Sequence, residues 1–230
     1  MTQAVYLENI QFSWSKHAQP LLDIAELSIA PGEKIFIQGR SGSGKTTLLG
    51  LLGGVLLPQQ GSVQLLGQTV SSLSSARRDA FRATHIGFVF QLFNLLPYLS
   101  VIDNVLLPCR FSKTRKIQAI QQTGSLSQAA TDLLEALELP ADFLQKPVAE
   151  LSVGQQQRVA FARALIGAPP ILITDEPTSA LDIDTQSGLL QLLFRECSNN
   201  QTTLIFVSHD QRLAAHFDRV IQMDKLTKTD

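Results

Sequence analysis

The residues best suited to chemistry stand at 39–46, where the sequence reads Gly39-Arg40-Ser41-Gly42-Ser43-Gly44-Lys45-Thr46. This is a complete G-x-x-x-x-G-K-[ST] phosphate-binding motif. Its glycines allow backbone conformations that bring several N–H groups onto phosphate oxygens, and a following helix adds its positive N-terminal end. Lys45 would reach the β- and γ-phosphates, and the Thr46 hydroxyl would bind Mg²⁺. The alternative is a glycine turn that binds nothing, and the full spacing argues against it.

A pair of carboxylates, Asp175 and Glu176, ends the apolar run 171–174. Two carboxylates at the end of a buried strand are costly unless they serve a cation or a reaction. Asp175 is suited to hold Mg²⁺, and Glu176 to polarise the water that attacks a γ-phosphate. Alone, the pair could equally be a helix N-cap or a surface turn, but after a phosphate loop the catalytic interpretation is favoured. The Thr174 hydroxyl within this run could bond to a neighbouring backbone carbonyl at little cost, so we interpret this residue as neutral.

Residues 151–158 read Leu-Ser-Val-Gly-Gln-Gln-Gln-Arg and lie between these two motifs. The pattern from Val153 to Ala164 predicts a helix for which Ser152 is a good N-cap. Gly154 in the first turn would permit close approach of another group. A helix N-terminus with a small hydroxyl residue is suited to bind an anion.

In this order along the chain, the three segments resemble the nucleotide-binding subunit of ABC (ATP-binding cassette) transporters, and the resemblance covers nearly the whole sequence. It implies that 39–46 is the Walker A loop and that Ile171–Asp175 is the Walker B strand, with Glu176 as catalytic base. It also implies that 151–155 is the signature, which in this family binds the γ-phosphate of ATP held by the other subunit. Two copies would then close around two ATP molecules. Val153 departs from the glycine that is commonest there.

The resemblance assigns further roles. Gln91 resembles the Q-loop glutamine that senses Mg²⁺ and faces the membrane partner, and His209 the switch histidine at the γ-phosphate. Trp14 resembles the aromatic residue that stacks on adenine, which suits the exposed hairpin edge predicted for 10–13; Phe12 is the second candidate for this role. Without the family context, an ordinary loop glutamine, a surface histidine and a core tryptophan are the alternatives. The residues implied in catalysis are Lys45, Gln91, Glu176 and His209; those that bind nucleotide are Trp14, 39–46, Thr47, Ser152, Gly154, Gln155 and, in the D-loop 179–182, Asp182; those that bind Mg²⁺ are Thr46, Gln91 and Asp175.

Segments 87–97 and 103–108 resemble one branch of the family, which contains lipoprotein-releasing, macrolide-export and FtsE-like ATPases. This resemblance implies an integral membrane permease as partner and a position at the cytoplasmic face of the inner membrane. It also implies export or extraction of a lipophilic, peptide or lipoprotein substrate. The alternatives are a mechanical ATPase that gates a transmembrane complex without transport, a soluble DNA-repair or translation ATPase, and a nucleotide-binding regulator without turnover.

Composition sets broad limits. With 230 residues and 44% hydrophobic content, the chain can bury a sizeable core within one domain. A net charge of −1 gives no broad basic field, so nucleic acid is not expected as a partner. Cys109 and Cys197 are expected to be free buried thiols. No apolar stretch approaches the roughly 20 residues that span a bilayer, so we expect membrane contact only through a partner.

We predict an α/β fold: a P-loop core with a parallel sheet, an N-terminal antiparallel β subdomain and an inserted helical subdomain. The single domain 1–230 would divide into a core, 1–91 and 165–230, and a helical part, 92–164. Within it, the patterns predict strands at Lys34–Gln38 and Val63–Leu66 and a helix from Thr46 to Leu57. We expect segment 112–128 to be a loop variation or a partner contact, and its basic cluster Lys113–Lys116 to lie on a solvated helix face.

Overall fold

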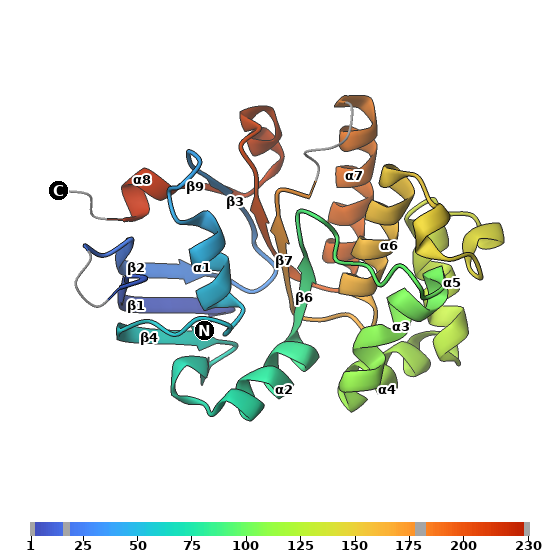
Figure 1. The fold of residues 1–230 in the computed structure, drawn as a ribbon, viewed down its shortest axis with the longest axis horizontal. Coiled ribbons are helices and arrows are strands. Elements are labelled where there is room, and N and C mark those ends of the chain that lie inside the picture. The colour runs from blue at the N-terminus through green and yellow to red at the C-terminus, as the bar shows by residue number, and fades with distance from the viewer. Residues whose placement is uncertain (1–2, 16–18, 178–182, 228–230) are drawn as a thin grey trace.

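Five parallel strands form the central sheet of the molecule, in the order β6-β7-β8-β3-β9 (Figure 1). The computed structural model describes residues 3–15, 19–177 and 183–227, and at 183–185 the backbone only. Val89 pairs with Thr174, and Asp175 pairs with Val207, so these strands end at one edge of the sheet. The strands are β3 Lys34–Gln38, β6 Ile86–Val89, β7 Ile171–Asp175, β8 Thr203–Val207 and β9 Arg219–Gln222.

Successive side chains of each strand point to opposite faces of this sheet, so they pack into two separate hydrophobic cores. Ile35 and Ile37 of β3 pack with helix α1 (Lys45–Leu52) and the second sheet. Phe36 between them, together with Leu172 and Phe206, packs against helices on the opposite face. Because both faces are covered, the inner positions of β3, β7 and β8 are mostly apolar and buried, as is typical of parallel sheets.

The second sheet is antiparallel and confirms the prediction for the N-terminal region (Figure 1). The edge predicted for residues 10–13 is wrong, however, because β4 pairs with β1 on the side away from β2. The side chains of Ile10 and Phe12 are buried in the core that this sheet shares with α1. The strand order is β2-β1-β4-β5, with β1 Val5–Phe12, β2 Leu22–Ile29, β4 Gln60–Leu65 and β5 Gln68–Thr69.

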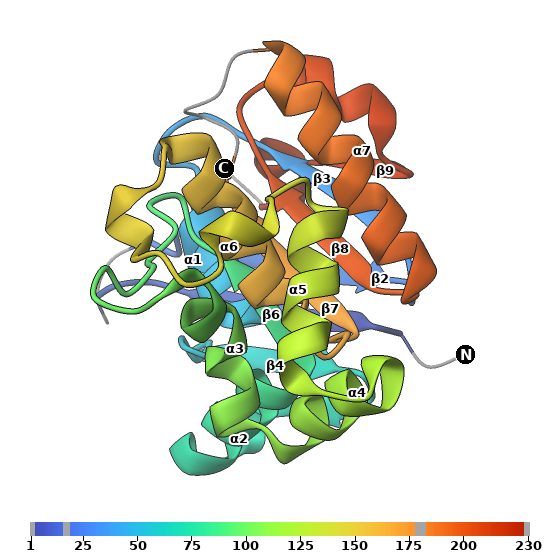
Figure 2. The same ribbon diagram turned by 90° about the vertical axis from the view of Figure 1, so that its right-hand side faces the viewer.

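Helices α3 to α6 gather beside β6 and β7, and α7 packs against the same core (Figures 1 and 2). None of the helices in the described ranges is long and apolar enough to cross a membrane. The α-helices are α2 Ser75–His85, α3 Val101–Phe111, α4 Lys113–Thr123, α5 Leu126–Ala136, α6 Val153–Leu165, α7 Ile183–Asn199 and α8 Met223–Leu226; the 3₁₀ helices are η1 Val70–Ser72, η2 Ala141–Phe143, η3 Val148–Glu150 and η4 Gln211–His216.

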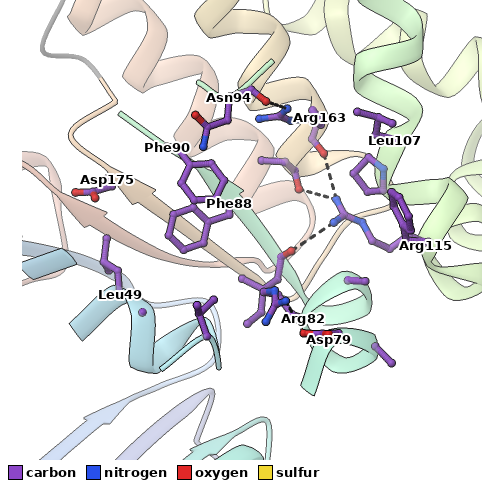
Figure 3. A pocket seen from close by; sticks show the side chains of 18 of the residues that line it. Leu49, Asp79, Arg82, Phe88, Phe90, Asn94, Leu107, Arg115, Arg163 and Asp175 are labelled. Atoms are coloured by element: carbon purple, nitrogen blue, oxygen red, sulfur yellow. Dashed lines mark hydrogen bonds and ion pairs between the residues drawn. The ribbon is translucent and has the colours of Figure 1, made fainter. Parts of the chain in front are cut away.

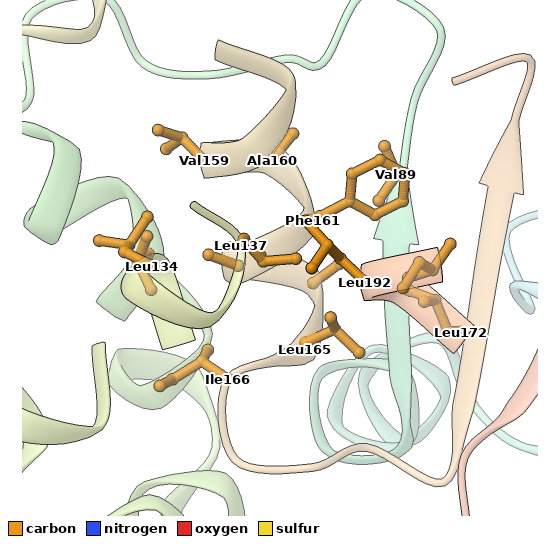
Figure 4. Close-up of a cluster of buried hydrophobic side chains, with 14 of the residues drawn as sticks. Val89, Leu134, Leu137, Val159, Ala160, Phe161, Leu165, Ile166, Leu172 and Leu192 are labelled. Carbon is orange, nitrogen blue, oxygen red and sulfur yellow. The ribbon is translucent and has the colours of Figure 1, made fainter. Parts of the chain in front are cut away.

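Phe161 joins helix α6 to the parallel sheet. Figure 4 shows its ring directed toward Val89 of β6, while Leu134 and Leu137 approach α6 from the α5 side. All four side chains are fully buried and belong to one cluster that also includes sheet residues such as Leu172. The helical group and the sheet therefore share a continuous core, and the division of the chain at 92–164 stays a prediction.

Two predicted boundaries are wrong. Helix α1 ends at Leu52 instead of Leu57, because the chain turns at Gly53 and at Gly54, which has φ +64°. Segment 112–128 is also no loop variation, since it contains α4 and the beginning of α5. Within its basic cluster, Arg115 is only 2% exposed, so the solvated face predicted for Lys113–Lys116 does not include it. The two cysteines are free and buried, as predicted.

Thr174 does not make the hydrogen bond that was open to it. Its Oγ1 is buried and has no partner in the described part of the chain. We therefore predict that Thr174→Val, which is nearly isosteric, raises the free energy of unfolding by about 1 kcal/mol, because a buried polar atom without a partner is removed. Urea unfolding of the nucleotide-free chain measures this change.

Thr203 on β8 provides a matched control. It is also buried, at 1% exposure, but its Oγ1 accepts a hydrogen bond of 2.9 Å from the Gly32 backbone N–H. Thr203→Val should therefore lower the free energy of unfolding by about 1 kcal/mol. Equal decreases in the free energy of unfolding in both variants would contradict the conclusion that the Thr174 hydroxyl has no hydrogen-bond partner.

Candidate functional site

The phosphate loop connects β3 to α1, as the motif requires. Gly44 is the N-cap of α1 with φ +89°, and a Cβ there would lie 2.8 Å from the Leu22 side chain. Lys45 is buried at the first position of the helix, and its Nζ donates to the backbone oxygens of Gly39 at 2.8 Å and Arg40 at 3.0 Å. The ammonium group is thus folded back onto its own loop, where a phosphate oxygen could replace either carbonyl.

The loop has the donors that a phosphate group needs. The Ser43 Oγ is buried and lacks a partner among the described residues. Helix α1 begins with no side-chain cap and no acidic residue in its first turn, so its N-terminal N–H groups and positive dipole end are available. These unsatisfied donors, together with Lys45, fit an anion of the size of a nucleotide's phosphates.

The two carboxylates face this loop from the end of β7. Asp175 Oδ2 accepts a hydrogen bond of 3.3 Å from Thr46 Oγ1. A hydroxyl beside a carboxylate supplies hard oxygen ligands, which suit Mg²⁺ when phosphates complete its coordination. Burial raises the pKa of Asp175 above its ordinary 3.8; the hydrogen bond from Thr46 opposes this rise and the charge of Glu176 adds to it.

Glu176 contacts two cationic or ionisable groups. Its Oε2 lies 3.2 Å from His209 Nδ1, and its Oε1 lies 3.9 Å from Lys45 Nζ. The Glu176 backbone has φ +45°, a conformation that is uncommon outside glycine, and its N–H donates to Val207 O at 2.9 Å. The sheet edge therefore holds this residue in a strained conformation that aims its carboxylate at the phosphate loop.

One cavity of about 550 Å³ unites most of the predicted site residues. Trp14 lies at its rim, 70% exposed and edge-on to Phe12, with ring centroids 5.2 Å apart. Leu21, which precedes β2, also lines the cavity, and no sequence signal pointed to it. The predicted residues that line the cavity are Trp14, Ser41, Gly42, Gly44, Lys45, Thr46, Thr47, Gln91, Asp175, Glu176 and His209.

The signature residues lie elsewhere. Ser152 caps α6: its Oγ accepts from the Gln155 N–H at 3.3 Å, and the Gln155 side chain accepts from the Ser152 N–H at 2.9 Å. Neither residue, nor Gly154, is among those that line the cavity of the same chain. Gly39 and Arg40 line a separate cavity of about 400 Å³ behind the loop. Asp182 lies outside the described residues.

A second, larger cavity adjoins the first and shares Thr46 and Asp175 with it. Its volume is about 730 Å³, and its walls come from α1, α2, β6 and α3 (Figure 3). Phe88, Phe90 and Phe111 are among its side chains, so most of its surface is apolar. We call this cavity the apolar groove.

Comparison with known proteins is consistent with this geometry. The model of the ABC transporter family matches residues 22–179, which is more than half of the chain. The chain is a member of the ABC transporter family. The α/β architecture predicted for it is confirmed by solved structures: the dimeric ATP-binding cassette MJ0796, in a post-hydrolysis state with ADP and Pi, is 34% identical, with a TM-score of 0.80 over 95% of this chain and 93% of that one.

Relatives of this ABC chain support the predicted branch. It is 41% identical to the lipoprotein-releasing system ATP-binding protein LolD of Syntrophotalea carbinolica, over 88% of this chain and 86% of the relative. It is also 41% identical to the macrolide export ATP-binding/permease protein MacB of Rhodopirellula baltica, over 90% of this chain but 29% of that longer protein.

The raised pKa of Asp175 has a consequence for the stability of the ABC chain. As pH rises from 3.8 through the folded-state pKa, the unfolded chain releases this proton first, so folding stability falls and stays lower at neutral pH. Asp175→Asn should therefore raise the free energy of unfolding at pH 7, and this increase should become smaller as the pH approaches 3.8. The same variant should lose Mg²⁺-dependent ATP hydrolysis. Urea titrations at several pH values measure the change.

Asp142→Asn is the control, since Asp142 is exposed on η2. It should leave both stability and hydrolysis unchanged. A loss of stability in Asp175→Asn at pH 7 would contradict the argument from burial.

Proposed function

We propose that the chain is an ATP-binding and ATP-hydrolysing subunit that pairs with a second copy around two ATP molecules and drives a membrane partner in export or extraction. The observation that carries the proposal is the single cavity in which Lys45, Glu176 and His209 meet the phosphate loop. The relatives support it: one is named for lipoprotein release and another for macrolide export.

Within the cavity, Lys45 exchanges its contacts with Gly39 O and Arg40 O for the β- and γ-phosphates of ATP. Trp14 at the rim stacks on the adenine, and Ser43 and the α1 N-terminus bind the phosphate oxygens. Mg²⁺, held by Thr46, Asp175 and Gln91, would neutralise charge on the phosphates. These contacts position the γ-phosphate and stabilise the charge of the transition state.

Glu176 then acts as general base. It accepts a proton from the water that attacks the γ-phosphate, and the bond from phosphorus to the bridging oxygen breaks. His209, 3.2 Å away, orients the carboxylate and approaches the γ-phosphate. Because Glu176 is strained at φ +45° but fixed by its bond to Val207, it needs little reorganisation to reach the water.

Pairing completes the site. Since Ser152, Gly154 and Gln155 stand apart from the cavity of their own chain, they are available to the γ-phosphate bound by a second copy. The helix end at Ser152 supplies N–H groups and a positive dipole there. Val153, half exposed in the first turn, is compatible with such a contact. The solved MJ0796 cassettes are dimeric, which supports this arrangement.

The apolar groove is the proposed docking site of the membrane partner. It lies beside Gln91 and shares Thr46 and Asp175 with the nucleotide cavity, so an occupant would respond to the state of the nucleotide. A short amphipathic helix of an integral membrane permease fits its shape and apolar walls. The chain would thereby be held at the cytoplasmic face of the inner membrane through this partner.

Glu176→Gln tests the catalytic assignment. The variant should bind ATP and hydrolyse it about 10²–10⁴-fold more slowly, because the general base is removed. In the presence of ATP the variant should then accumulate as a dimer, which analytical ultracentrifugation with and without Mg²⁺ measures. Turnover at the wild-type rate would disprove the role of Glu176.

The added substitution Ser152→Arg provides the control for pairing. It changes the signature end of α6, away from the cavity that binds nucleotide in the same chain. In the Glu176→Gln background it should preserve ATP binding by the monomer and prevent the dimer. A dimer that persists would show that the chains pair through another surface.

A second prediction concerns the groove. Phe111 lines it and is 78% exposed, so Phe111→Glu should leave folding and the intrinsic ATPase intact but reduce recovery of the membrane subunit from detergent-solubilised membranes. Tagged Glu176→Gln with ATP and Mg²⁺ serves as the bait. Ile117→Glu is the matched control, because Ile117 is an exposed apolar residue on α4 outside the groove. Equal recovery with both variants would exclude the groove as the docking site.

A further inference from the structure

Arg115 is a buried cation without a counter-ion. It lies in the first turn of α4 and is 2% exposed. Among the described residues no carboxylate lies within ion-pair distance of it. Burial lowers the pKa of its guanidinium to about 10, so the group stays charged at neutral pH. A charge in such surroundings is costly unless its N–H groups are satisfied, and the partners that satisfy them define its role.

The partners are backbone carbonyls of two elements of the site. Arg115 Nε donates to Ile166 O at 2.8 Å and Nη2 to Ala164 O at 2.6 Å, with a longer contact of 3.5 Å to Arg163 O. These carbonyls belong to the C-terminal end of α6, where a helix leaves oxygens unsatisfied and favours a cation. Arg115 Nη1 reaches Ile86 O, at the beginning of β6, at 3.5 Å.

Close backbone packing surrounds this guanidinium. A Cβ on Gly167 would lie 2.5 Å from Arg115 O, and a Cβ on Gly87 would lie 2.3 Å from Ala164 O. The backbone of α4 at Arg115 is therefore in close contact with Gly167, just after α6, and the backbone of β6 at Gly87 is in close contact with the last turn of α6. Figure 3 shows Arg115 among the residues that line the apolar groove, with dashed lines from its guanidinium to oxygens of other lining residues.

The two elements that Arg115 contacts, α6 and β6, both lead to residues of the proposed site. Helix α6 has 13 residues, so Ser152 at its N-terminus lies about 20 Å from the end that Arg115 holds. Strand β6 leads to Gln91. Arg163 on α6 makes a second link, to the segment that follows β6, because its guanidinium donates to Asn94 O at 2.6 Å and to Phe93 O. Phe93 and Asn94 have φ of +60° and +49°, so α6 holds a strained part of the segment after Gln91.

We propose that Arg115 is a positioning residue that fixes the orientation of α6 relative to β6, and thereby presents Ser152 to the ATP held by a second copy. It contacts no nucleotide. Since a rigid helix converts a small rotation at one end into a displacement at the other, loss of the guanidinium contacts would misalign the signature end. The inference rests on the proposed function, because it concerns ATP-dependent pairing.

The experiment compares three substitutions in the Glu176→Gln background. Arg115→Met keeps an unbranched chain but removes every donor, Arg115→Lys keeps the charge with fewer donors, and Lys116→Met removes a neighbouring exposed charge. Two quantities are measured for each folded variant: ATP affinity of the monomer at high dilution, and the ATP-dependent dimer dissociation constant by ultracentrifugation. Circular dichroism establishes which variants are folded.

Arg115→Met should weaken the dimer about tenfold or more while ATP affinity of the monomer changes less than about twofold. Arg115→Lys should be intermediate, and Lys116→Met should match the parent. A general loss of structure would instead weaken ATP binding by the monomer and ATP-dependent pairing together, and that result would overturn the proposal. So would unchanged pairing in Arg115→Met, or, if that variant does not fold, unchanged pairing in Arg115→Lys. If the parent itself does not pair with ATP, the proposed function fails first, and the inference fails with it.

Discussion

The parallel arrangement of β3, β6, β7 and β8 is the constraint on which the site depends. Parallel strands in register end at one edge, so the segments that follow them meet there. The phosphate loop follows β3, Gln91 follows β6, the two carboxylates follow β7, and His209 follows β8. Residues more than 160 positions apart, such as Lys45 and His209, thus line one cavity. The alternating burial of the strands maintains this edge, because each strand is anchored in a core on both faces.

This edge of the sheet is electrostatically and conformationally costly. The Ser43 hydroxyl has no described partner, α1 begins uncapped, Asp175 is partly desolvated and Glu176 has a strained backbone. Such costs are commonly retained where a bound group relieves them. They coincide with the residues that carry the proposed chemistry, so the least satisfied part of the molecule is also the part suited to bind phosphates and Mg²⁺.

Helix α6 connects this edge to the proposed partners. Its N-terminus carries the signature, its middle is fixed to the sheet by Phe161, and its C-terminal turn is held by buried Arg115. Arg163 ties the same turn to the segment after Gln91, at the border of the apolar groove. In the proposed mechanism, a partner in the groove would therefore act on the orientation of Ser152 through this one helix.

The sequence by itself indicated the chemistry: the phosphate motif, the carboxylate pair and the N-cap at Ser152 are local patterns that residue types and spacing identify. It also predicted the parallel core and the antiparallel N-terminal region, because apolar periodicity is local. Only the tertiary structure decided that β1 lies inside its sheet, that Thr174 has no described partner and that Arg115, within a basic cluster, is buried. Each of these depends on which distant backbone packs nearby, as Ala164 and Ile166 do for Arg115. A pattern of neighbouring residues carries no information about such partners.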